Sequence, residues 1–378
     1  MRYGVQLVAM TMTLQGALFS CVIGRSQDSP STPKAGTTES SAIAAAKQAP
    51  DNLSRVRAAG TFCLQKEKWG ESVYWLSRAY KLSHSDRQVG YDLAFAQIEA
   101  GDFKEADEQL HDMMAGRDAA KLHSLRALLE ERTGDLSGAA HEYYRAVELE
   151  PSEGNQFELA DFLLQHKKYS GYLQESVKFF RYGVSQFRDS AKMRVGLGVA
   201  LYASEEYDEA VKVLCEAVDL APDDPKPVTF LGMARRVSPE LAQQVDDRLK
   251  GFSERYPDNP AANYEYAVSL WARKGGEEGK NLFEIEKLLA KTIAKSPQWF
   301  EPHYQLGLVY ESEAKYVDAI REIRRACVLE PAFKPAHFRL AGLYKRIGDR
   351  QHANLEAARA KQLDNDEINS TLLQDANK

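Results

Sequence analysis

The sequence predicts an all-α fold in which helix pairs repeat along the chain and stack into a solenoid. The first observation is a track of small residues that recurs about every 34 positions. The second is another track of recurring positions, later in each period, that keeps the same register. The third is that glycine–aspartate pairs lie inside several periods and prolines lie at their ends. Alternation of period two is absent over any useful length, so no strand pattern competes with this interpretation.

The two tracks mark close contacts between helices. The first track recurs once in each period, at Gly60, Ala94, Ala127, Ala160, Gly198, Gly232, Val268, Gly307 and Ala341. The second track does the same, at Ala79, Met113, Ala146, Gly183, Ala217, Gly251, Thr292, Ala326 and Ala360. Small side chains let the helices of one pair, and those of the next pair, approach closely, while Leu, Tyr and Phe fill the space beside them. Two tracks in one register predict nine helix pairs.

Glycine, aspartate and proline predict where these helices begin and end. The glycine–aspartate pairs are Gly101-Asp102, Gly134-Asp135 and Gly348-Asp349. A left-handed glycine can end the first helix of a pair, and the aspartate can cap the second. The prolines are Pro151, Pro222, Pro297 and Pro331, and each is expected to follow a second helix because proline cannot continue one.

The repeated unit resembles the tetratricopeptide repeat, whose pattern is an aromatic residue, Leu-Gly, Tyr, Ala, a bulky apolar residue, Ala and Pro. The best match is the run from His303 to Tyr310, with Leu306-Gly307 in it and Ala319, Ala326 and Pro331 after it. A shift by one period gives His337, Leu340, Ala341, Tyr344, Ala353 and Ala360, and Leu197-Gly198, Leu201, Ala210, Ala217 and Pro222 keep the same offsets.

This resemblance covers residues 53–366 and implies a right-handed superhelical solenoid of about nine helix-turn-helix units. The units are expected to begin near residues 53, 87, 120, 153, 191, 225, 261, 300 and 334, and residues 367–378 would form a polar tail or cap. Three units depart from the pattern. The fourth carries extra residues at 168–172, the seventh has a long turn at 274–280, and the sixth lacks the small residue early in its second helix.

The N-terminal residues 1–24 are expected to form an export signal. Arg2 is the only charged residue before Arg25, and the apolar stretch of residues 5–19 is shorter than the ~20 residues that a membrane-spanning helix needs. Residues 18–21 resemble a bacterial lipobox, which implies cleavage before Cys21 and a lipid on its sulfur. Phe19 departs from that pattern, so plain secretion with cleavage after Gly24 stays open. A third possibility is a cytoplasmic protein whose true start is Met10 or Met12.

The next segment, residues 25–52, is expected to be a disordered tether. Ser, Thr, Pro, Gly and Ala dominate residues 25–49, and Ile43 is the one large apolar residue there. Such a segment buries too little apolar surface to offset the entropy that it would lose on ordering.

The sequence contains no complete catalytic or metal-binding motif. The turn from Gly275 to Lys280 lacks the residues of a phosphate-binding loop, and His141-Glu142 lacks the second histidine of a zinc-protease helix because Arg145 stands there. His303 and His337 occupy equivalent places in neighbouring units, where each could replace the usual packed aromatic or approach the other as a metal ligand. We expect packing, no metal, no cofactor and no enzyme.

The net charge bears on the class of partner, and the cysteine spacing bears on the state of the thiols. The net charge of −6 on 378 residues argues against a nucleic-acid binder, which usually carries a concentrated basic face. Cys63, Cys215 and Cys327 are far apart, form no CxxC pair, and are expected to be buried thiols.

The resemblance implies that the first helix of each pair lines a concave groove in which partner peptides or helices lie. Thirteen residues match that face: Tyr91, Phe95, Ile98, Phe157, Asp161, Val195, Val199, Tyr202, Phe230, Met233, Tyr304, Leu308 and Phe338. Val195 and Val199 stand where relatives that clamp a chaperone's C-terminal carboxylate have Lys and Asn, which disfavours that function. The alternative is that the stripe is core.

These observations predict an exported, non-catalytic scaffold that binds partner proteins in the bacterial cell envelope, periplasmic or anchored to the outer membrane through a lipid on Cys21. It resembles repeat lipoproteins that serve pilus, polysaccharide-export or outer-membrane assembly. A carbohydrate-binding helper subunit of an envelope polysaccharide export or secretion pathway is the alternative, and Asp161 beside Phe157 is its only support.

Overall fold

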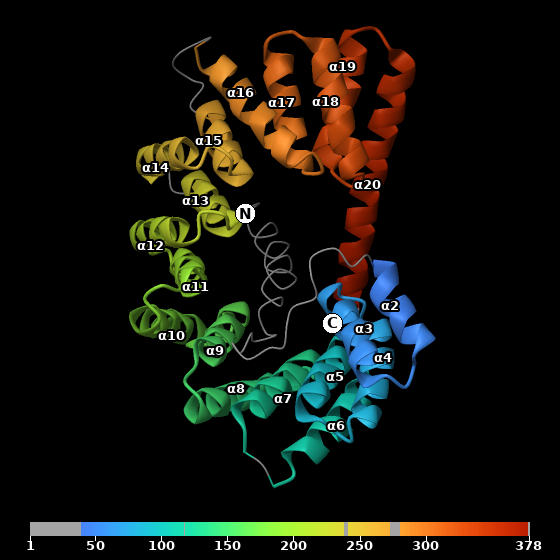
Figure 1. Cartoon of the computed structure of the whole chain (residues 1–378). Coiled ribbons are helices and arrows are strands. Elements are labelled where there is room, and N and C mark those ends of the chain that lie inside the picture. The colour runs from blue at the N-terminus through green and yellow to red at the C-terminus, as the bar shows by residue number, and fades with distance from the viewer. Residues whose placement is uncertain (1–38, 117, 238–240, 273–279, 377–378) are drawn as a thin grey trace. The chain divides into compact units, whose positions relative to one another are not determined.

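All regular secondary structure in the described part of the chain is helical. The computed structural model describes residues 39–116, 118–237, 241–272 and 280–376, and no strand occurs in these ranges (Figure 1). None of the described helices is both long and apolar enough to cross a membrane. The chain divides into two compact units, residues 1–188 and 189–378, each of which is a stack of helix pairs. The predicted all-α fold is confirmed.

The described part of the first unit contains one leading helix and four helix pairs. Its helices are α2 (Glu39–Gln48), α3 (Leu53–Gln65), α4 (Trp69–Leu82), α5 (Arg87–Ala100), α6 (Phe103–Met114), α7 (Ala120–Thr133), α8 (Leu136–Leu149), α9 (Glu153–Gln165) and α10 (Tyr172–Gln186). From α3 onward, each odd-numbered helix is the first helix of a pair and packs against the even-numbered helix that follows it. Each first helix also contacts the next first helix, as α5 contacts α7.

Helix α2 corrects the predicted tether. Residues 39–48 are helical and pack against α3, where Ala46 is fully buried and Ile43 lies against the same hydrophobic core. Alanine is the best helix former, and Ile43 and Ala46 lie three residues apart on one helix face, so a short contact with α3 suffices to order them. Residues 25–38 of the expected tether and the whole expected signal lie outside the described residues.

In the ranges that the structure describes, the second unit contains five helix pairs. Its helices are α11 (Ala191–Ala203), α12 (Tyr207–Leu220), α13 (Pro225–Val237), α14 (Ala242–Arg255), α15 (Pro260–Ala272), α16 (Lys280–Lys295), α17 (Phe300–Ser312), α18 (Tyr316–Leu329), α19 (Lys334–Arg346) and α20 (Arg350–Ala376). One continuous core runs from α12 to α17, and a second core joins α18 and α19. The last helix is longer than the other second helices, since α20 continues to Ala376 through most of the segment that was expected to be a polar tail or cap.

The turns inside the pairs explain part of the helix boundaries. Gly101, Gly134 and Gly348 all have a left-handed backbone, with φ of 84°, 92° and 85°, and end α5, α7 and α19. Asp135 accepts a hydrogen bond from the backbone N–H of Gly138 at 2.9 Å, and Asp349 accepts one from His352 at 3.1 Å. These two aspartates cap α8 and α20 as expected. Asp102 precedes α6 without a side-chain capping bond.

Candidate functional site

The candidate site is the first-helix face, which we define as the side of the first helices that the second helices leave uncovered. Every substantial contact between helices of the described ranges involves a first helix, and second helices do not pack substantially against one another there. The first helices α3 to α9 and α11 to α15 therefore form a continuous layer within their respective units. Side chains from successive repeats can act together on such a layer.

In the first unit, this layer carries a linked set of polar side chains on α5 and α7. Lys121 Nζ lies 4.7 Å from the centre of the Tyr91 ring and 3.5 Å from Gln88 Oε1. Gln88 Nε2 donates to Asp92 Oδ1 at 2.8 Å, one turn further along α5. Because Lys121 follows Gln88 by one repeat length, the two side chains lie side by side on neighbouring first helices.

Burial shifts the titration of the two charged members of this set. Desolvation lowers the pKa of Lys121, although Asp92 and Glu158 oppose the shift. Desolvation likewise raises the pKa of Asp92, against the opposing effects of Lys121, Gln88 and Arg57. Both charges have thus lost part of their hydration, so a partner that supplies opposite charges would meet a smaller desolvation cost here than on an open surface.

Four of the thirteen predicted groove residues belong to the core. Phe95, Ile98, Phe157 and Val195 are buried, so the prediction that they line an accessible groove is wrong. Phe95 packs edge-to-face against Trp69, with ring centres 6.0 Å apart, and Phe157 packs similarly against Phe180 at 5.5 Å. Each first helix is flanked by helices of its own pair and of the neighbouring pairs, which cover positions that a helix in a single pair would expose.

The other predicted residues retain accessible surface. Phe338 is exposed, and the half-buried ones are Tyr91, Asp161, Val199, Tyr202, Phe230, Met233, Tyr304 and Leu308. Val199 and Tyr202 lie on α11, and Phe230 and Met233 lie on α13, which contacts α11. We call these four residues the apolar strip. That the strip binds a partner stays a prediction.

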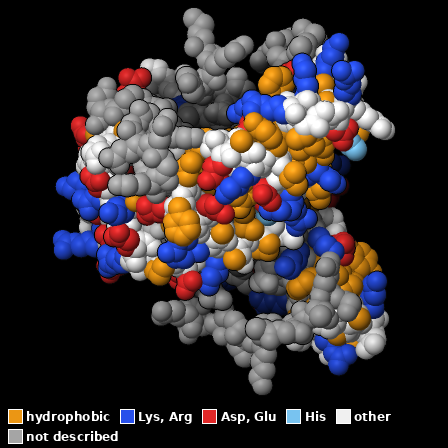
Figure 2. Space-filling model, turned by 90° about the horizontal axis from the view of Figure 1, so that it is seen from above, with side chains coloured by type: hydrophobic (Ala, Val, Ile, Leu, Met, Phe, Trp, Pro, Cys, Tyr) orange, Lys and Arg blue, Asp and Glu red, His pale blue; other side chains and the backbone are white. Residues whose placement is uncertain are grey.

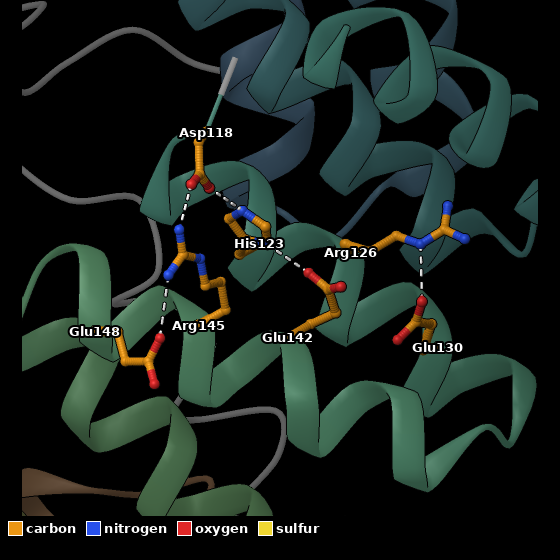
Figure 3. Close-up of polar contacts among 7 residues, drawn as sticks. All are labelled: Asp118, His123, Arg126, Glu130, Glu142, Arg145 and Glu148. Atoms are coloured by element: carbon orange, nitrogen blue, oxygen red, sulfur yellow. Dashed lines mark hydrogen bonds and ion pairs between the residues drawn. The ribbon is translucent and has the colours of Figure 1, made fainter. Parts of the chain in front are cut away.

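A histidine-centred cluster between α7 and α8 was not predicted (Figure 3). His123 Nδ1 lies 2.5 Å from Glu142 Oε2, and His123 Nε2 lies 2.7 Å from Asp118 Oδ1. The ring can donate to both carboxylates only in its doubly protonated form. Arg145 forms an ion pair with the same Asp118 and also donates a hydrogen bond to Glu148 at 3.2 Å. Hydrogen bonds from Arg145 and then from His123 lower the pKa of Asp118. The cluster ties the segment before α7 to both helices of the pair.

The same histidine position recurs in two repeats of the second unit. His303 Nδ1 lies 2.9 Å from Glu322, and His337 Nδ1 lies 2.6 Å from Glu356. Both histidines are buried, and the spacing from histidine to glutamate is the same in all three cases, which is a pattern that the sequence analysis overlooked. These pairs link first to second helices. Within the described ranges, no three His, Cys, Asp or Glu side chains form a group that could hold a metal ion.

Two further predictions concern the long turn of the seventh unit and the three cysteines of the repeats. Residues 273–279 of the long turn in the seventh unit lie outside the described residues. Cys63 and Cys215 are buried, whereas Cys327 is half-buried, with its Sγ 3.8 Å from His337 Nδ1.

Comparisons with known proteins agree with this architecture. A tetratricopeptide-repeat family model matches residues 163–225, from the end of α9 to the start of α13. Yeast Tom70 is 13% identical with a TM-score of 0.51, over 89% of this chain and 83% of that chain. MamA is 18% identical with a TM-score of 0.38, over 46% of this chain and 97% of that chain. TTC0263, a tetratricopeptide-repeat protein of Thermus thermophilus, is 21% identical with a TM-score of 0.38, over 50% of this chain and 98% of that chain.

The comparison with curated proteins finds no match. At these identities, the likeness to Tom70 concerns the fold alone. Together with the stacked helix pairs, it confirms a solenoid of the tetratricopeptide type.

Proposed function

We propose that this protein is a non-catalytic scaffold that binds segments of partner proteins along its first-helix faces. The observation that carries the proposal is the apolar strip on α11 and α13. Its four side chains are half-buried, and both Tyr202 and Phe230 rest on the core beneath them, so they are held in place while part of their surface faces solvent. Covering such surface is favourable, and well-supported aromatic side chains commonly dominate the energetics of an interface.

The charge distribution favours a polypeptide partner. Hydrophobic, acidic and basic side chains lie interspersed on the face seen in Figure 2. The polar set around Lys121 likewise brings both signs of charge to the first-helix face of the first unit. A mixed surface of this kind matches peptide or helical segments better than a uniformly anionic nucleic acid.

The carbohydrate alternative loses its support, because Phe157 is buried against Phe180 and offers no platform beside Asp161. The Asp161 carboxylate accepts a hydrogen bond from Gln165 at 2.9 Å, on its own helix.

We also propose that the protein is located in the cell envelope. This location rests on the apolar segment and the lipobox-like residues at the N-terminus, which end at Cys21. Mass spectrometry of the mature N-terminus tests it, and Cys21→Ala should move the protein out of the membrane fraction. Recovery of an uncleaved Met1 would contradict export, and unchanged fractionation of Cys21→Ala would contradict lipidation.

Partner capture tests the scaffold itself. The full chain should retain specific proteins from solubilised cell envelopes, and the double variant Tyr202→Ser, Phe230→Ser should lose them while circular dichroism shows unchanged helicity. Tyr182→Ser is the matched control, because Tyr182 is an exposed aromatic residue on the second helix α10. If the double variant keeps its partners, the apolar strip is not the binding surface.

A further inference from the structure

The exposed face of α19 differs in composition from the rest of the first-helix face. Its exposed residues are Pro335, Phe338, Arg339, Gly342, Lys345 and Arg346. Three of these carry positive charge and none carries negative charge. Phe338 is 74% exposed, although phenylalanine is among the residues most often buried.

The acidic neighbours only partly neutralise this face. Glu311 on α17 lies 3.4 Å from Arg339 and 3.6 Å from Arg346, so one carboxylate serves two guanidinium groups. Lys345 has no ion-pair partner among the described residues. Two positive charges therefore stay uncompensated within one helix face.

The spacing along α19 separates the Phe338 ring from two of the three cations, Lys345 and Arg346. Phe338, Gly342 and Lys345 follow each other at intervals of four and three residues, which places them on one side of the helix. A Cβ on Gly342 would have no heavy atom within 4 Å, so the space between the Phe338 ring and these two cations is open. At a rise of about 1.5 Å per residue, roughly 10 to 12 Å separate Phe338 from Lys345 and Arg346.

We propose that this face of α19 binds an acidic peptide segment of a partner protein. An apolar side chain of the peptide packs on Phe338, and carboxylates three or four residues away pair with Lys345 and Arg346. That spacing follows because an extended chain advances about 3.3 Å per residue and so covers the distance in three or four residues. The proposal rests on the proposed scaffold function and specifies the partner at the C-terminal end of the array.

The charge pattern distinguishes a peptide from other anionic partners. Nucleic acid presents a phosphate every few ångströms and needs a longer row of cations than these three, with no carboxylate such as Glu311 among them. An anionic membrane surface calls for several large exposed apolar side chains beside the cations, whereas Phe338 is the one exposed large hydrophobic residue within α19.

Fluorescence anisotropy with the purified full chain tests the proposal. The probes are two fluorescein-labelled Gly/Ser peptides that carry one Phe and two Glu, with the Glu three and four positions after the Phe in one peptide and before it in the other. The controls are the same peptides with Gln in place of Glu. At least one acidic peptide should bind, and its affinity should fall with added salt because exposed charge pairs are screened.

Two variants and two matched controls locate the site. Lys345→Glu and Phe338→Ser should each weaken binding about tenfold, the first by charge reversal and the second by loss of the apolar contact. Lys361→Glu, an exposed lysine on α20, and Val328→Ser, an exposed apolar residue on α18, should leave it unchanged. Circular dichroism confirms that all four variants are folded.

Equal binding of Glu and Gln peptides, or unchanged binding by Lys345→Glu, would overturn the proposal. Vesicles of phosphatidylserine and phosphatidylcholine provide a further arm: if they bind in a Lys345-dependent manner while no peptide binds, the face recognises a membrane and the proposal is wrong. If no peptide binds but partner capture still depends on Tyr202 and Phe230, this inference fails and the scaffold function stands.

Discussion

Gly198 on α11 lies so close to Leu214 on α12 that no larger residue fits between them. A Cβ on Gly198 would lie 2.6 Å from Leu214 Cγ and 2.7 Å from Leu214 Cδ2, and Leu214 is itself fully packed in the core. The same relationship joins Gly307 to Ile323, where the corresponding distance is 2.3 Å. At these two positions of the first track, glycine is therefore a steric requirement for pairing the two helices.

Gly198→Leu should therefore destabilise the protein by about 1–3 kcal/mol, the usual effect of overpacking. Gly251→Ala is the control, because a Cβ there has no heavy atom within 4 Å and alanine has the higher helix propensity by about 1 kcal/mol. Urea denaturation followed by circular dichroism measures both variants. Equal stability of Gly198→Leu and the wild type would mean that α11 and α12 do not pair as described.

This steric requirement explains why the fold could be predicted from the sequence. A position that favours small side chains recurs along the array, so its spacing is visible without any knowledge of contacts. The groove residues were harder to predict. Phe95 and Tyr91 lie on the same helix, but Phe95 is buried where it packs against Trp69 and the surrounding core, whereas Tyr91 stays half-buried.

Polar interactions inside the stack also escaped prediction. The sixth unit was expected to lack a small residue early in its second helix, but the buried ion pair of that unit was not foreseen. Asp246 on α14 is buried and pairs with Arg235 on α13 through both carboxylate oxygens. In both this pair and the histidine–glutamate pairs, the two partners lie on different helices. They are therefore far apart in the sequence and show no short-range pattern.

The ion pair between Asp246 and Arg235 gives a second prediction. Asp246 is only 2% exposed, and Arg235 Nη2 also donates to the backbone oxygen of Ser269 on α15 at 3.3 Å. Asp246→Ala would leave the guanidinium buried without its counter-charge and should cost about 3–5 kcal/mol. Thermal or urea unfolding measures the loss.

The matched control for Asp246→Ala is Glu254→Ala on the same helix. Glu254 pairs with Lys250 at 3.8 Å, and both side chains are well exposed, so this change should cost less than about 0.5 kcal/mol. A similar loss in both variants would show that burial does not set the strength of the Asp246 pair.

A third prediction concerns the thiol of Cys215. Burial raises its pKa from the ordinary 9.0 to about 11, so the reactive thiolate is about a hundredfold rarer at pH 8 than for a free thiol. Iodoacetamide should label Cys215 of the native protein at least that much more slowly than in urea, as measured by mass spectrometry of the tryptic peptide. Fast labelling of the native protein at pH 8 would contradict the burial of this thiol.

The same shift predicts how stability changes at alkaline pH. Because the folded thiol keeps its proton to a higher pH than the unfolded one, the unfolded state binds fewer protons between pH 9 and 11. Stability should therefore fall as the pH rises through this range. Cys215→Ser is an unsuitable control since it adds a buried hydroxyl group, whereas Cys215→Ala removes titration at this site and should reduce the slope.

The last prediction compares two tyrosines to separate site from core. Tyr344 on α19 is buried in the second core of its unit and stacks on His352, with ring centres 5.1 Å apart. Tyr202 on α11 is half-buried and meets Tyr207 edge-to-face at 5.4 Å. Tyr344→Ala should cost about 3–5 kcal/mol, as truncation of a buried aromatic does, and Tyr202→Ala should cost clearly less. Tyr310 occupies the same repeat position as Tyr344, but it is half-buried and donates a hydrogen bond to Glu286 at 3.0 Å. The cost of Tyr310→Ala should therefore lie between the costs of the other two variants.

Partner capture with the same variants completes the comparison. Tyr202→Ala should weaken capture while the protein stays folded, because the exposed part of its ring is the part that a partner would cover. Mild destabilisation without loss of partners would exclude the apolar strip as the binding surface. If Tyr202→Ala instead unfolds the second unit as severely as Tyr344→Ala, the strip is structural, and the search for partners should move to the α19 face and to the polar set around Lys121.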